Sequence, residues 1–149
     1  MGADQQLTGK GAANAGHAHM ETIVLVMASL KLTYLLLFEA MPCLIDYYSE
    51  AVRLDVDALP LTLRVRYALL TQRMLEHGSD LGAPHTKALG AGLLEMRLKG
   101  AEGIARVLYC AMVGRRIVVL HSFVKKTDKI PAKDLALARN RLKELKNDR

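Results

Sequence analysis

The chain has 149 residues, of which 51% are hydrophobic, which is enough for one domain with a packed core plus an appendage. Its net charge of +6 comes from residues 90–149, which hold fourteen cations and six anions. This part is therefore either a solvated basic surface or a contact for a polyanion such as RNA, DNA or an acidic protein. There is no Trp, and the two cysteines, Cys43 and Cys110, lie in different segments. These features argue against an aromatic base-stacking platform and a disulfide framework, and they fit a reducing cytosol.

The first forty residues differ in composition from the rest. Residues 1–20 are rich in Gly, Ala and polar side chains without a period, so we expect them to be disordered. The pair His17 and His19 falls in this leader and is not a convincing metal site. An apolar run with a single charge, Lys31, follows at residues 23–38 (IVLVMASLKLTYLLLF).

Several interpretations of this apolar run are open. As a membrane span it falls short of the usual ~20 residues, and Lys31 lies near its middle. As a signal peptide it lacks a basic start and a small-residue cleavage site. It would otherwise pack on the domain, mediate oligomerisation, or lie upstream of a natural start at Met27 or Met41. We favour packing, oligomerisation or a later natural start over the membrane and signal interpretations. We therefore treat residues 1–40 as an extension outside the domain and expect no membrane partner.

Residues 41–149 have the pattern of one domain. Residues 44–52 are predicted to form a short opening strand. Acidic residues and Pro60 then predict a helix over residues 61–76, which has an apolar stripe and ends at Gly78. Residues 80–86 form a loop and residues 89–92 a Gly-bearing turn. Three strand-like segments and a final helix follow, at residues 93–98, 104–113, 117–124 and 132–146.

This order of elements predicts an α+β domain. The three consecutive strands form a small antiparallel sheet, and the N-terminal and C-terminal helices pack on one of its faces. Adjacent strands of such a meander bring side chains that are distant in sequence onto one patch. The basic residues of the strands are therefore candidates for a common site.

Three motifs resemble those of a known superfamily. They are LLEMRL at residues 93–98, IARVLY at residues 104–109 and LHSFVKKTDKIP at residues 120–131. This pattern resembles the RelE/ParE superfamily, and within it the HigB-like, phage-derived toxins. The resemblance covers roughly residues 45–145, is strongest over residues 91–139, and implies a RelE-like fold for residues 41–149.

The resemblance implies the toxin of a type II toxin–antitoxin system. Such a toxin is a cytoplasmic, metal-independent endoribonuclease that needs no cofactor and cuts mRNA on the ribosome. The 2′-hydroxyl attacks the adjacent phosphorus, which gives a 2′,3′-cyclic phosphate and a 5′-hydroxyl. The implied partner is a helix-turn-helix, HigA-like antitoxin, through which the toxin would contact DNA only indirectly.

This chemistry needs cations for the phosphorane charge and groups that move protons. We assign phosphate clamping to Arg97 and Arg106, because a guanidinium fork suits two phosphate oxygens. His121 has the ordinary pKa best suited to proton transfer near neutrality. By resemblance, Lys126 or Lys125 lies near the leaving group.

Further candidates for substrate binding are Lys87, Lys99 and Tyr109. Each assignment has a structural alternative: a solvated strand face for the cations, and a core position for His121 and Tyr109. Glu95 stands where some related toxins carry Lys, so it is either a base or a sign of weaker catalysis. Two other functions stay open, a gyrase-poisoning ParE-like toxin and a non-catalytic phage-derived binding protein.

Overall fold

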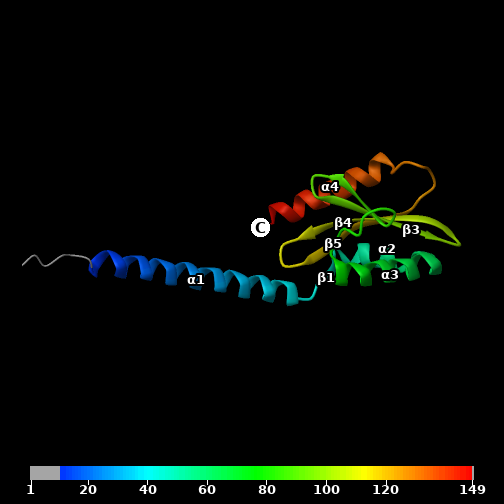
Figure 1. Cartoon of the computed structure of the whole chain (residues 1–149). Helices are drawn as coiled ribbons and strands as arrows, with labels where there is room; N and C mark the ends of the chain where they lie inside the picture. The colour runs from blue at the N-terminus through cyan, green and yellow to red at the C-terminus, as the bar shows by residue number, and fades with distance from the viewer. Residues whose placement is uncertain (1–10, 149) are drawn as a thin grey trace, which may run out of the picture. The chain divides into compact units, whose positions relative to one another are not determined.

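The computed structural model describes residues 11–148, with side chains from Gly16 onward, and divides the chain into the units Met1–Met41 and Pro42–Arg149 (Figure 1). The first unit contains the helix α1, Gly11–Ala40. The expectation of disorder was therefore wrong for residues 11–20, where alanines of high helix propensity are frequent. For residues 1–10 that expectation lies outside the described residues.

The apolar run belongs to a longer element than the sequence pattern indicated. By length and composition, Gly16–Ala40 is a 25-residue helix that would be able to cross a membrane. Signal sequences near an N-terminus share these properties. The segment to which the membrane and signal interpretations apply is thus a helix of 25 residues.

The second unit is an α+β domain, as predicted (Figure 1). Its sheet has the strand order β1-β5-β4-β3-β2, and all neighbours are antiparallel except β1 and β5. The three consecutive strands β3, β4 and β5 are antiparallel as predicted, and the opening strand β1 joins their edge in parallel with β5. The elements are β1 (Leu44–Tyr47), α2 (Glu50–Asp57), α3 (Leu61–His77), β2 (Thr86–Gly90), β3 (Leu93–Gly100), β4 (Gly103–Met112), β5 (Arg116–Val124) and α4 (Ala132–Asn147).

Two short elements depart from the sequence prediction. The opening strand ends at Tyr47 because Ser49 caps a helix instead: its hydroxyl accepts a hydrogen bond from the backbone N–H of Val52. The segment expected to be a loop and a turn, residues 80–92, contains the strand β2. This strand pairs with β3, and the pairing is interrupted by a bulge at Ala88–Gly90. The cap at Gly78, with φ of 99°, ends α3 as predicted.

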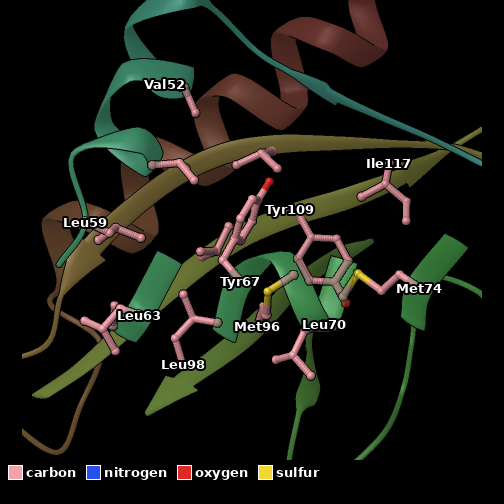
Figure 2. Close-up of a cluster of buried hydrophobic side chains, with 14 residues drawn as sticks. Val52, Leu59, Leu63, Tyr67, Leu70, Met74, Met96, Leu98, Tyr109 and Ile117 are labelled. Carbon is pink, nitrogen blue, oxygen red and sulfur yellow. The ribbon is translucent and has the colours of Figure 1, made fainter. Parts of the chain in front are cut away.

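The helices cover both faces of the sheet, so the expectation that they share one face was wrong. One core joins α2 and α3 to the sheet through residues such as Leu63, Leu70 and Tyr109, which Figure 2 shows. A second core joins α4 to the opposite face through residues such as Leu108 and Leu142. The reason lies in β4, whose residues 107–110 are all buried, so that both faces of this strand need cover.

A bulge in β5 sets which of its side chains face α4. Tyr109 pairs with Val119, but the preceding Leu108 pairs with His121, so Leu120 is the extra residue. Leu120 packs in the core under α4, and His121 lies on the same face because its partner Leu108 does. The bulge therefore moves His121 away from the face of Val119, with which simple alternation would have grouped it.

Candidate active site

The two predicted phosphate-clamping arginines lie side by side. Arg97 on β3 and Arg106 on β4 are direct cross-strand partners, on the sheet face that carries α4. Both line a pocket of about 430 Å³ near the start of β2. The other lining residues are Arg66, Pro84, His85, Leu98, Lys99 and Ile104. The pocket therefore gathers four cationic side chains around one concave surface.

A buried carboxylate sits beneath the two arginines. Glu95 is 3% exposed, with one oxygen 2.8 Å from Nε of Arg97 and the other 3.6 Å from Nε of Arg106. Burial lowers the pKa of the Arg106 guanidinium, while the charge of Glu95 opposes that shift. Glu95 thus lies on the predicted active face, where it orients both guanidinium groups and neutralises part of their charge.

A second basic hollow adjoins this pocket at Ile104. It has a volume of about 270 Å³ and is lined by Ile104, Lys125, Lys126, Thr127 and Asp128. The backbone N–H of Lys125 donates to the carbonyl of Ile104 at 2.7 Å, which holds the end of β5 against the start of β4. Five of the predicted site residues, Arg97, Lys99, Arg106, Lys125 and Lys126, consequently lie around two adjoining hollows.

His121 lies on the same face but lines neither hollow. Its Nε2 is 2.7 Å from Oδ1 of Asp134, near the start of α4, and both side chains are largely buried. Its ring also stacks on Phe123, with ring centroids 5.7 Å apart. This geometry makes His121 one of the residues that hold α4 against the sheet.

We expect His121→Ala and Asp134→Ala each to lower the free energy of unfolding, by roughly 1–3 kcal/mol, because each leaves a buried polar partner unsatisfied. The double variant is expected to lose less unfolding free energy than the two single variants lose together, since the residues share one contact. Urea unfolding of the four proteins measures this coupling. Additive losses would show that the contact contributes nothing to stability.

Two predicted substrate-binding residues lie away from the hollows. Lys87 is exposed on the edge strand β2, opposite Glu95 in the strand register. Tyr109 is fully buried in the core beneath α3, where its hydroxyl donates to the carbonyl of Ser79. Tyr109 therefore takes the core position that was its structural alternative, because its place in β4 turns it to the face covered by α2 and α3.

The structure adds three residues that the sequence analysis did not select. Arg66 and Arg73 lie seven residues apart, on one side of α3, and both reach His85, which directly precedes β2. The spacing of the two arginines over two helical turns was the one signal in the sequence. Among the described residues, no group of three His, Cys, Asp or Glu side chains is arranged to hold a metal ion.

Two comparisons with known proteins found a match. The family model "Phage derived protein Gp49-like" matches residues 55–143, which is more than half of the chain. A solved structure of a mutant of the E. coli toxin RelE in the free state is 15% identical, with a TM-score of 0.45, over 68% of this chain and 99% of that one. No curated protein matches. The chain belongs to the Gp49-like family of RelE/HigB-type toxins.

Proposed function

We propose that this toxin is a metal-independent endoribonuclease that cuts mRNA through attack of the ribose 2′-hydroxyl. The observation that carries the proposal is the pairing of Arg97 and Arg106 at one pocket, with Lys99 beside them. Two adjacent guanidinium groups match the oxygens of a phosphodiester and stabilise the extra charge of the phosphorane. Glu95 fixes their orientation before the substrate arrives.

The adjoining hollow supports a longer RNA contact. Lys125 and Lys126 continue the basic surface past Ile104, so that neighbouring phosphates of one strand would be bound together. In this proposal Lys126 lies toward the leaving 5′-oxygen. The ribosome presents the mRNA, and the toxin acts in the cytoplasm. Its antitoxin is of the helix-turn-helix, HigA-like type, and silences it by covering the basic hollows.

Cleavage by the purified full chain tests the proposal. We expect a defined RNA to be cut in the presence of EDTA, with 2′,3′-cyclic phosphate and 5′-hydroxyl ends, with or without added ribosomes. In cells, induced expression is expected to arrest growth and to give new mRNA 5′ ends in primer extension. Arrest without mRNA cleavage would favour a gyrase poison. Absence of both effects would favour a non-catalytic binding protein.

A further inference from the structure

The pocket contains a histidine held between two arginines of α3. Nδ1 of His85 is 3.3 Å from a terminal nitrogen of Arg66, and Nε2 is 3.2 Å from a terminal nitrogen of Arg73. Arg66 lines the pocket with His85, while Arg73 does not. Among the described residues, neither arginine makes an ion pair with a carboxylate. The two cations are thus directed at one neutral group.

The ring cannot satisfy both neighbours. A guanidinium only donates hydrogen bonds, and a neutral imidazole offers one lone pair, whereas an imidazolium offers none. His85 therefore accepts from one arginine at a time, and protonation would remove even that contact. The arrangement is incomplete without an anion, because a phosphate in the pocket would accept from Arg66 and leave the lone pair of Nδ1 free.

The surrounding charges all disfavour a protonated ring. Partial burial and the charges of Arg73 and Arg66 lower the pKa of His85 below its ordinary value. From the sheet, the other charged groups at the pocket are Arg97, Lys99 and Arg106. The nearby carboxylates are occupied elsewhere: Glu95 by Arg97 and Arg106, and Asp80 by the hydroxyl of Thr86 and the backbone N–H of Gly82.

We infer that His85 is the general base of the cleavage reaction, an inference that rests on the ribonuclease function proposed above. Nδ1 takes the proton of the 2′-hydroxyl as O2′ bonds to phosphorus, and the bond from phosphorus to O5′ breaks. The 5′-oxygen then takes a proton from water, and the imidazolium returns its proton to water. Arg66 binds the phosphate. Arg73 acts on the ring through its charge, because Nε2 carries the proton when Nδ1 is the base and cannot accept a hydrogen bond from the guanidinium.

The pH dependence of kcat/KM for RNA cleavage tests this role. A base must be unprotonated, so kcat/KM of the wild type is expected to rise with pH. It should level off above an inflection that lies below about pH 6.5. Arg73→Gln removes a cation from the ring and is expected to move the inflection upward. His85→Ala is expected to remove this limb and to slow cleavage by about 10²–10⁴-fold. His77→Ala, at an exposed histidine at the end of α3, is the matched control and is expected to leave rate and profile unchanged.

The ring's own titration gives a second readout that does not depend on activity. In proton NMR of the full chain, the ring signal of His85 is expected to give a titration midpoint below about pH 6.5 in the wild type. The midpoint is expected to lie at a higher pH in Arg73→Gln. An unshifted titration, or an unchanged rate and profile in His85→Ala, would overturn the role of His85 while leaving the ribonuclease proposal standing. If the wild type cleaves no RNA under any condition, the proposed function itself fails, and this inference with it.

Discussion

Replacement of Arg106 by Ala is expected to slow RNA cleavage by about 10²–10³-fold, the usual effect of removing one donor that stabilises transition-state charge. Arg106 is the more buried of the two paired arginines, with 11% of its side chain exposed against 36% for Arg97. Its charge is therefore less screened by solvent and interacts more strongly with a bound phosphate. Single-turnover cleavage of a defined RNA measures the effect.

Two further variants separate charge from geometry. Arg106→Lys keeps the charge but loses the two-pronged donor, so we expect it to recover only part of the rate. Lys87→Ala removes an exposed cation from β2, outside both hollows, and is expected to stay within about threefold of the wild type. Equal losses for Arg106→Ala and Lys87→Ala would mean that general basic charge, rather than a defined pocket, carries the activity.

Removal of the buried carboxylate is expected to have opposite effects on stability and on RNA binding. Glu95→Gln leaves Arg97 and Arg106 without their counter-charge, so we expect the free energy of unfolding to fall by about 1–3 kcal/mol. The same variant gains one unit of positive charge at the pocket. Its affinity for single-stranded RNA is expected to rise at low salt, and the slope of log K against log salt to steepen by about 0.7.

The matched control for this variant is Glu102→Gln. Glu102 is an exposed carboxylate in the turn between β3 and β4, where it accepts hydrogen bonds from Thr62 instead of an arginine of the pocket. Urea unfolding and salt-dependent RNA binding should distinguish the two variants. If Glu95→Gln were as stable as the wild type and kept its salt slope, Glu95 would not be holding the arginine pair.

Local patterns were sufficient to predict the longer elements. α3, α4 and the meander β3-β4-β5 follow from helical or alternating periodicity, and the same alternation placed Arg97 and Arg106 on one face. The opening strand was predicted but too long, because Ser49 begins the helix α2. The strand β2 escaped because its pairing with β3 decides it.

The parts of the site that were missed depend on contacts between distant segments. Arg66, Arg73 and His85 come from a helix and from the loop after it, and apart from the spacing of the two arginines nothing in their local sequence indicates that they converge. His121 was grouped with Val119 by simple alternation, but the bulge in β5 reverses its side. Neither bulge nor helix packing leaves a Gly or Pro signal at these positions, so only the folded chain reveals them.

The edges of the sheet have a consequence for how the protein behaves at high concentration. The two outer strands, β1 and β2, are the shortest, with four and five residues, and β2 also has a bulge and the exposed Lys87. Short, charged and bulged edges are poor templates for strand addition by a second molecule. The toxin domain is therefore protected from edge-to-edge aggregation, and insolubility of the full chain in the absence of detergent would originate in the apolar helix α1.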